Sequence, residues 1–296
     1  MIKRSFFKSR YLPYFLILPQ VIVTLTFFYW PAFQGLMQSF LLSDPFGRQS
    51  KFVWFYNYIE LFSDPLYLKS ILITFVFSLS VAIVSLSLGL FIATMANRAL
   101  RATALVRTLL IWPYAVAPAI SGILWLFLLH PSYGIVALGI KNVFGMNWNP
   151  VLNGTDAMVM ITMASAWKQI SYNFVFFMAG MQAIPKSLIE AAAIDGASPL
   201  RRFWSITFPL LSPTFFFLSV MNIIYSFFET FGVIHTVTQG GPGGSTNILV
   251  YKVYQDGFVG LNMGSSSAQS VILMSLIILI TVIQFRFVEK KVQYTG

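Results

Sequence analysis

The chain has 296 residues, of which 57% are hydrophobic and only 9% are charged, and it contains no cysteine. Soluble domains carry about 25% charged residues, so the composition excludes an ordinary water-soluble protein, and the missing cysteines exclude a disulfide framework and thiolate metal sites. The net charge of +10 does not indicate nucleic-acid binding, because the basic residues do not gather on one soluble surface.

Long stretches without acidic or basic residues recur along the chain, and about 20 apolar residues cross a bilayer as a helix. Lipid offers the backbone no hydrogen-bond partners, which favours helices. We therefore predict an all-α polytopic membrane protein with six transmembrane helices. The predicted spans cover residues 12–40, 69–97, 104–129, 157–183, 208–236 and 266–287.

Basic residues flank alternate ends of these predicted spans, which is the pattern that fixes orientation by the positive-inside rule. Both termini are therefore expected in the cytoplasm. The residues that carry this expectation are Lys3, Arg4, Lys8, Arg10, Arg98, Arg101, Arg107, Lys186, Arg201, Arg202, Arg286, Lys290 and Lys291.

The third predicted span contains Pro113 and Pro118 in "WPYAVAPAI". Proline lacks a backbone donor and clashes with the preceding turn. We therefore expect a kink between these two positions.

Two ionisable residues lie inside predicted spans, where a charge is costly unless it is paired or faces a cavity. Lys168 lies in the fourth span and Glu229 in the fifth. One interpretation is a buried ion pair between them. The other is a polar translocation path, in which Lys168, Ser165 and Tyr172 share a helical face and the ammonium suits an anionic substrate such as a phosphate ester.

The sequence contains no arrangement typical of a catalytic site. His130 and His235 are the only histidines, so an H-E-x-x-H zinc site is excluded. No G-x-x-x-x-G-K-[ST] segment is present. We therefore expect neither an enzyme nor a resident metal or cofactor, and any ATP would be bound by a partner.

A polar segment, "EAAAIDGASPLRRFWSITFPLLSP", follows the fourth span on the expected cytoplasmic side. Ser187 and Glu190 match a capping box, Gly196 favours the left-handed end of a helix, and Ser198 with Pro199 forms a second helix start. The predicted structure is a short helix, a turn and a second helix. A helix of about eight residues is marginal alone, so it packs either in a partner's groove or against its own bundle.

The same segment resembles the permease subunits of bacterial ABC importers, on the pattern formed by Glu190, Ala191, Ala192, Gly196, Ile206 and Pro209. Phe208 replaces the usual leucine. The resemblance implies that residues 184–207 form a coupling-helix loop that docks into a cytoplasmic ATPase. The implied docking residues are Glu190, Ala191, Ala192, Asp195 and Gly196.

Further segments, including "TQGGPGGST", "YQDGF" and "SSSAQS", resemble the sugar and glycerol-phosphate branch, and most closely the permeases that serve sn-glycerol-3-phosphate importers. Trp54 departs from this branch, where glycine is usual. The resemblance implies one permease domain over residues 1–296 with the type I importer fold, placed in the bacterial inner membrane.

The resemblance also implies several partners: a second homologous permease, two ATPase subunits and a periplasmic solute-binding protein. The expected cargo is sn-glycerol-3-phosphate or a related glycerophosphodiester. Two alternatives remain at this point, an importer of a neutral sugar or oligosaccharide and an ion-coupled secondary transporter. The latter is disfavoured because the chain shows no internal repeat of the kind common in such folds.

Overall fold

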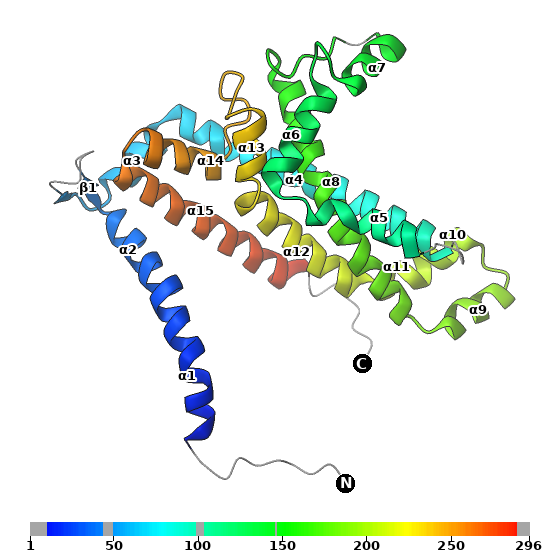
Figure 1. Cartoon of the computed structure of the whole chain (residues 1–296). Coiled ribbons are helices and arrows are strands. Elements are labelled where there is room, and N and C mark those ends of the chain that lie inside the picture. Colours follow the sequence, from blue (N-terminus) through cyan, green and yellow to red (C-terminus); the bar gives the residue numbers. More distant parts are fainter. Residues whose placement is uncertain (1–10, 44–49, 99–103, 146, 289–296) are drawn as a thin grey trace. The chain divides into compact units, whose positions relative to one another are not determined.

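The computed structural model describes residues 11–43, 50–98, 104–145 and 147–288, and these residues are mostly helical (Figure 1). The chain separates into two compact units. The first unit comprises Met1–Ser63 and Gln255–Ile272, and the second comprises Asp64–Tyr254 and Leu273–Gly296. Lys3, Arg4, Lys8, Arg10, Arg101, Lys290 and Lys291, which support the predicted orientation, lie outside the described residues.

The first unit begins with one continuous helical run made of α1 (Leu12–Thr24), the π-helical segment η1 (Leu25–Tyr29) and α2 (Trp30–Gln38). Pro31 cannot donate the next intrahelical hydrogen bond, and the wider π turn directly before it accommodates that missing donor. None of the apolar run is buried within the chain. Its side chains are therefore available to lipid or to another subunit.

The rest of the first unit is a short hairpin with helices around it. Its elements are β1 (Leu41–Ser43), β2 (Ser50–Phe52), α3 (Tyr56–Ser63), the π-helical η3 (Gln255–Val259) and the start of α15 (Met263–Ile283). The strands are antiparallel, with Leu41 opposite Phe52. Asn57 Nδ2 donates to the carbonyls of Ser39 at 2.8 Å and Leu41 at 3.0 Å. A side chain at Gly264 would meet the Leu41 carbonyl, so the close approach of α15 requires glycine there.

The second unit is a helical bundle whose long members are α4 (Pro65–Arg98) and α8 (Gly154–Ala183), which pack along one another. Its remaining elements are α5 (Ala104–Ala115), α6 (Pro118–Leu129), α7 (Ile135–Phe144), α9 (Lys186–Ile194), α10 (Pro199–Arg202), η2 (Phe203–Thr207), α11 (Phe208–Leu210), α12 (Ser212–Phe228), α13 (Phe231–Val237), α14 (Leu249–Tyr254) and, after the end of α15, η4 (Gln284–Val288).

Buried polar groups join three helices in the interior of this bundle. Asn173 of α8 and Asn222 of α12 exchange side-chain hydrogen bonds of 2.8 and 3.2 Å. Ser85 of α4 donates to the Asn222 amide oxygen at 2.6 Å, and Gly89 leaves the space that Asn173 fills. Because an unpaired amide in a dry interior is costly, this network fixes the relative register of α4, α8 and α12.

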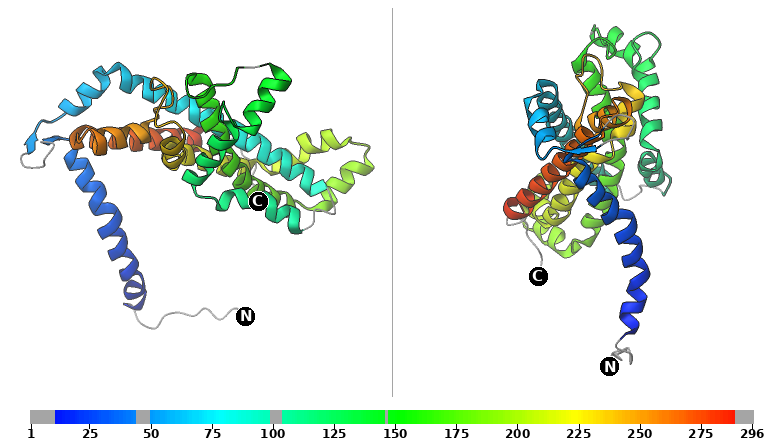
Figure 2. Two further views of the ribbon diagram at one scale, coloured as in Figure 1. Left: turned by 45° about the horizontal axis from the view of Figure 1, so that its top comes forward. Right: turned by 90° about the vertical axis from the view of Figure 1, so that its left-hand side faces the viewer.

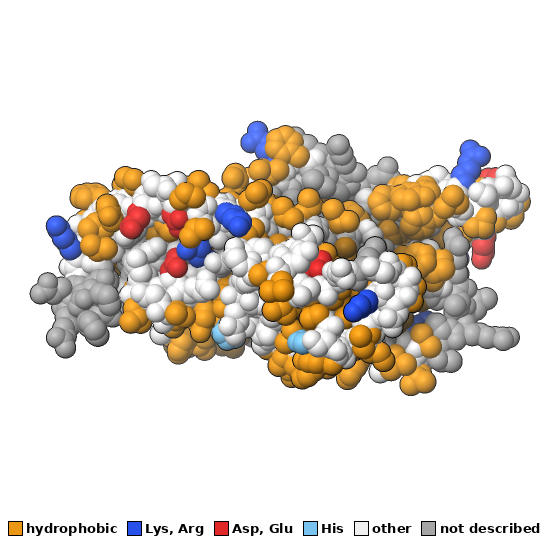
Figure 3. All heavy atoms as spheres, turned by 90° about the horizontal axis from the view of Figure 1, so that it is seen from above, with side chains coloured by type: hydrophobic (Ala, Val, Ile, Leu, Met, Phe, Trp, Pro, Cys, Tyr) orange, Lys and Arg blue, Asp and Glu red, His pale blue; other side chains and the backbone are white. Residues whose placement is uncertain are grey.

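The lengths of the helices agree with a membrane protein. Among the described residues, three helices are long and apolar enough to cross a bilayer, or up to five if each of two bent pairs counts as one span. The three are Leu12–Gln38, Pro65–Asn97 and Met263–Phe287, and the bent pairs are Leu105–Ala115 with Pro118–Leu129 and Pro199–Leu210 with Ser212–Phe228. Figure 3 shows hydrophobic side chains over much of the visible face, with few charged ones.

The kink predicted in the third span is confirmed and is larger than a simple bend. The axes of α5 and α6 differ by 103°, and Pro118 begins α6 without a backbone donor. A second bend of 67° separates Pro199–Leu210 from α12. The helix α8 has 30 residues, which is enough to cross a bilayer. Its polar side chains make it less apolar than the helices counted above, so the sixth span remains a prediction.

Candidate functional site

The short helix α9 lies at one end of the second unit, as Figure 1 and the left view of Figure 2 show. It begins directly after Pro185, which is the N-cap and makes no side-chain capping bond. The capping box predicted from Ser187 and Glu190 is therefore wrong. Pro185 starts the helix two residues earlier, so Ser187 lies inside the first turn and cannot cap it.

The turn predicted after this helix is confirmed. Gly196 has φ +77°, and the backbone N–H of Ala197 donates to the Ala192 carbonyl at 3.0 Å, which closes the helix in the manner of a left-handed glycine cap. Ser198 then caps α10 by accepting from the Arg201 N–H at 3.3 Å, with Pro199 at the first helical position. The helix, turn and second helix follow from local sequence.

The expected docking residues are on the surface of the isolated chain. Glu190, Ala191, Asp195 and Gly196 are exposed, and Ala192 is half-buried. Ile194, in the same stretch, is 87% exposed. A short helix is marginal alone in water, so these uncovered side chains leave a surface on which another element or another protein can pack.

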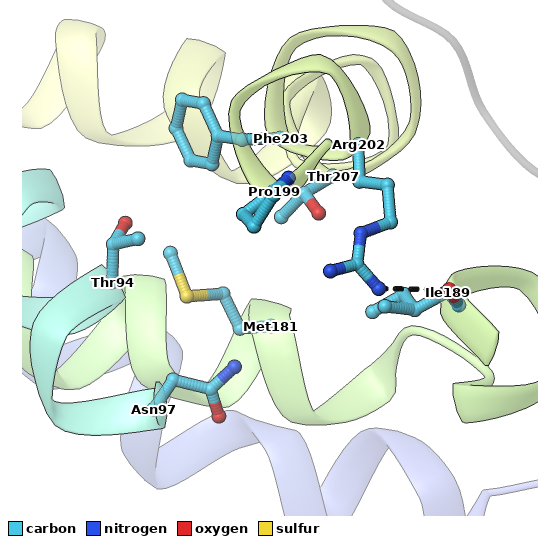
Figure 4. A pocket seen from close by; sticks show the side chains of 8 residues that line it. All are labelled: Thr94, Asn97, Met181, Ile189, Pro199, Arg202, Phe203 and Thr207. Atoms are coloured by element: carbon cyan, nitrogen blue, oxygen red, sulfur yellow. Dashed lines mark hydrogen bonds between the residues drawn. The ribbon is translucent and has the colours of Figure 1, made fainter. Parts of the chain in front are cut away.

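A small cavity lies at the joint between α9 and the rest of the unit (Figure 4). The Arg202 guanidinium reaches the Ile189 carbonyl, with Nη1 and the oxygen 3.5 Å apart. The cavity holds about 180 Å³ and is lined by Thr94, Asn97, Met181, Ile189, Pro199, Arg202, Phe203 and Thr207. Residues near the ends of both long helices, α4 and α8, thus lie at the joint that α9 makes with the rest of the unit.

A second hollow, of about 70 Å³, lies within the bundle and is lined by Tyr114, Gln169, Tyr172, Met221, Ile224, Tyr225 and Glu229. The Tyr114 and Tyr172 ring centroids are 5.3 Å apart, and the Tyr172 ring lies 4.7 Å from that of Phe176. The hollow has room for only a few water molecules. Tyr114 and Glu229 in its wall are exposed, so the hollow is partly open, and we call the Tyr114–Tyr172 ring contact beside it the constriction.

The structure brings together only part of the predicted path. Tyr172 and Glu229 line the hollow, whereas Lys168 and Ser165 do not. Ser165 is fully buried, and its hydroxyl has no partner among the described residues. Lys168 is 6% exposed, and its ammonium donates to the carbonyl of Val116. Within the described chain, no ion pair joins Lys168 to Glu229, whose side chain is exposed.

Sequence reasoning missed Tyr114, Gln169 and Tyr225, which also line the hollow. Gln169 and Tyr172 have the i, i+3 spacing of neighbours on one helical face, so that pair carried a local signal. Tyr114 belongs to the proline segment "WPYAVAPAI". Its approach to α8 comes from the packing of α5 on α8, which the local sequence does not specify.

Neither region has the groups that hold a metal. Among the residues that the structure describes, no three His, Cys, Asp or Glu side chains gather closely enough to bind an ion. The arrangement offers an exposed short helix, a joint between that helix and the bundle, and a hollow lined by aromatic rings.

Comparison with known proteins places these features in a family. Residues 85–294 match the family described as binding-protein-dependent transport system inner membrane component. The sn-glycerol-3-phosphate transport system permease protein UgpA of Rhizobium meliloti (strain 1021) is 56% identical over 292 residues, which cover 99% of both chains. The protein of the same name from Yersinia pestis is 52% identical over 291 residues, 98% of each chain.

Two solved structures share the fold. One is a bacterial ABC transporter involved in the import of the acidic polysaccharide alginate, with TM-score 0.79 and 20% identity over 94% of this chain and 96% of that chain. The other is a bacterial alginate ABC transporter in complex with alginate pentasaccharide-bound periplasmic protein, with TM-score 0.81 and 19% identity over 93% and 92%. At these identities the likeness concerns the fold alone.

Proposed function

Because the chain belongs to the family of inner membrane components of binding-protein-dependent transport systems, as the sequence resemblance predicted, we propose that it carries sn-glycerol-3-phosphate, or related glycerophosphodiesters, into the cytoplasm. The observation that carries this proposal is the identity of 52 to 56% to permeases of that name over almost the whole of both chains. Because the similarity extends over almost the whole chain, it includes the helical bundle and the loop over residues 184–207.

The proposed assembly pairs this chain with a second, homologous permease in the inner membrane. Two cytoplasmic ATPase subunits bind and hydrolyse ATP, and a periplasmic protein delivers the solute. This chain is then a non-catalytic subunit with six spans, cytoplasmic termini and no cofactor of its own. The name of the family, which specifies dependence on a binding protein, supports the external partner. The lack of a phosphate-binding loop in the sequence supports a separate ATPase.

In this proposal the loop over residues 184–207 is the contact with the ATPase. Glu190, Ala191, Ala192, Asp195 and Gly196 form the docking surface, which is largely exposed in the isolated chain. The alanines allow close backbone approach, and the exposed Ile194 supplies apolar area for burial. Closure of the ATPase dimer on ATP draws the docking helices together, and the joint at Arg202 passes this motion to α4 and α8.

The substrate path in this proposal runs past the aromatic hollow. Tyr172 and Glu229 line it, and Lys168 and Ser165 precede Tyr172 on the same helix, α8. A positive charge in a dry interior acts over a longer range than in water, so the ammonium of Lys168 favours an anionic phosphate ester near the hollow. The hollow is too small for such a solute, so the helices must separate there during transport.

Uptake of labelled sn-glycerol-3-phosphate in a strain lacking this chain tests the function. We expect uptake to disappear, to return with the wild-type chain and to stop when ATP is depleted. Loss of neutral sugar uptake instead, with glycerol-3-phosphate uptake intact, would assign the chain to a sugar importer. Uptake that survives ATP depletion and follows the membrane potential would identify an ion-coupled transporter.

A further inference from the structure

The break between α5 and α6 leaves a backbone carbonyl without its usual partner. Val116 lies in this break, where the helix axes differ by 103°. No backbone N–H of the described residues donates to the Val116 carbonyl, whereas the next carbonyl, of Ala117, accepts from Ser121 at 3.0 Å. Inside a membrane protein, such an orphan carbonyl must be satisfied by another part of the protein.

The ammonium of Lys168 satisfies it. Lys168 comes from the middle of α8, is 6% exposed, and donates to the Val116 oxygen. The carbonyls at the C-terminal end of a helix carry partial negative charge. The ammonium at the end of α5 therefore stabilises that end both by its hydrogen bond and by its positive charge. One side chain thus joins the broken span to the central helix of the bundle.

This bond lies directly beside the aromatic hollow. Tyr114 precedes Val116 by two residues and Tyr172 follows Lys168 by one helical turn. Their rings are 5.3 Å apart, and both line the hollow. A contact that holds Val116 against α8 therefore also holds Tyr114 against Tyr172.

We propose that Lys168 is a positioning residue for transport, which closes the end of α5 through the Val116 carbonyl and thereby sets the Tyr114–Tyr172 constriction. The geometry distinguishes this role from two others. An ammonium dedicated to an ion pair would contact Glu229, which it does not. An ammonium that binds the solute by direct contact would line the hollow, and Lys168 is not among the lining residues, so its charge acts on the solute only from a distance.

This inference rests on the proposed import function for its transport readout, but it has a second readout that does not. Because the chain lacks cysteine, Tyr114→Cys with Tyr172→Cys gives this chain two thiols only, one at each ring position of the constriction. The yield of cross-linking by a short bifunctional thiol reagent, in the complete transporter reconstituted in lipid, reports whether α5 stays against α8.

We expect Lys168→Met to lower the cross-linking yield severalfold and, with the native tyrosines, to lower transport about tenfold, the effect of leaving one carbonyl unpaired. Lys168→Arg, which keeps the positive charge and the N–H donors, should retain most of the cross-linking yield and most of the transport. Lys141→Met, the same change on the exposed surface of α7, leaves both unchanged. If Lys168→Met prevents assembly, Lys168→Gln, a shorter neutral donor, takes its place and is expected to give intermediate values.

Unchanged cross-linking in Lys168→Met or Lys168→Gln, together with lost transport, would overturn the positioning role and assign Lys168 to the solute. Cross-linking that falls equally in Lys168→Arg and Lys168→Met would also overturn it, because the donors would then be irrelevant. If the wild-type transporter does not move glycerol-3-phosphate, the proposed function fails while the cross-linking result still decides the role of Lys168.

Discussion

The backbone conformation of Gly196 makes this residue decisive for the shape of the loop proposed to dock on the ATPase. Glycine adopts its φ of +77° without strain, whereas a residue with a side chain pays about 1 to 2 kcal/mol for this left-handed conformation. We expect Gly196→Val to open the end of α9, displace Ala191 and Ala192 and abolish transport, while the chain still inserts into the membrane. Co-purification of the ATPase with the variant measures the docking directly.

Gly139→Val is the matched control for this experiment. Gly139 lies in the interior of α7, its φ is not left-handed, and a Cβ there meets nothing within 4 Å. The control should therefore keep both transport and ATPase binding. Undiminished ATPase binding by Gly196→Val would remove α9 as the docking surface, whatever happened to transport.

At the scale of elements, Arg202 is one link between α9 and the rest of the second unit. Arg202 of α10 reaches the Ile189 carbonyl of α9 and lines the joint cavity with Thr94 and Met181. A variant with Arg202→Met keeps the docking surface but loosens its link to α4 and α8. We expect ATP hydrolysis to continue while solute moved per ATP falls, because the guanidinium no longer contacts the Ile189 carbonyl across the joint.

The adjacent Arg201 provides the control, because its side chain is exposed and its substitution by methionine removes the same charge. Arg201→Met should keep the wild-type ratio of transport to hydrolysis. Equal ratios for Arg202→Met and the wild type would show that motion reaches the spans by another route. Loss of ATPase binding in Arg202→Met would place Arg202 in the docking surface itself.

The elements differ in how far the sequence predicts them, and the reason is the range of the forces involved. Gly196, Ser198 and Pro199 act on their own turn, so the end of α9 and the start of α10 were predictable. The predicted capping box was wrong because the helix begins directly after Pro185, two residues before the start that Ser187 would have given. Tyr114 and Glu229, far apart in the chain, meet at the hollow only through tertiary packing, which no local pattern encodes.

At the scale of the whole molecule, the number of spans depends on α8. Its 30 residues extend for about 45 Å, more than the roughly 30 Å of hydrocarbon in a bilayer. Yet its polar side chains, including Lys168, Gln169 and Asn173, are buried inside the bundle rather than exposed to lipid. Mean hydropathy depends on which side chains a helix has and not on whether they face lipid or the protein interior. It is therefore low for a membrane-spanning helix whose polar side chains point into the bundle.

A crossing α8 places its two flanking loops on opposite sides of the membrane. Asn142, in α7, and Ser187, in α9, are both exposed, and the cysteine-free chain allows one thiol at each position in turn. We expect a membrane-impermeant maleimide applied to intact spheroplasts to label Asn142→Cys and not Ser187→Cys. Both should be labelled after permeabilisation, which controls for reactivity. Equal labelling of both in intact spheroplasts would place α7 and α9 on the same side, and neither the six-span topology nor a cytoplasmic docking loop would survive that result.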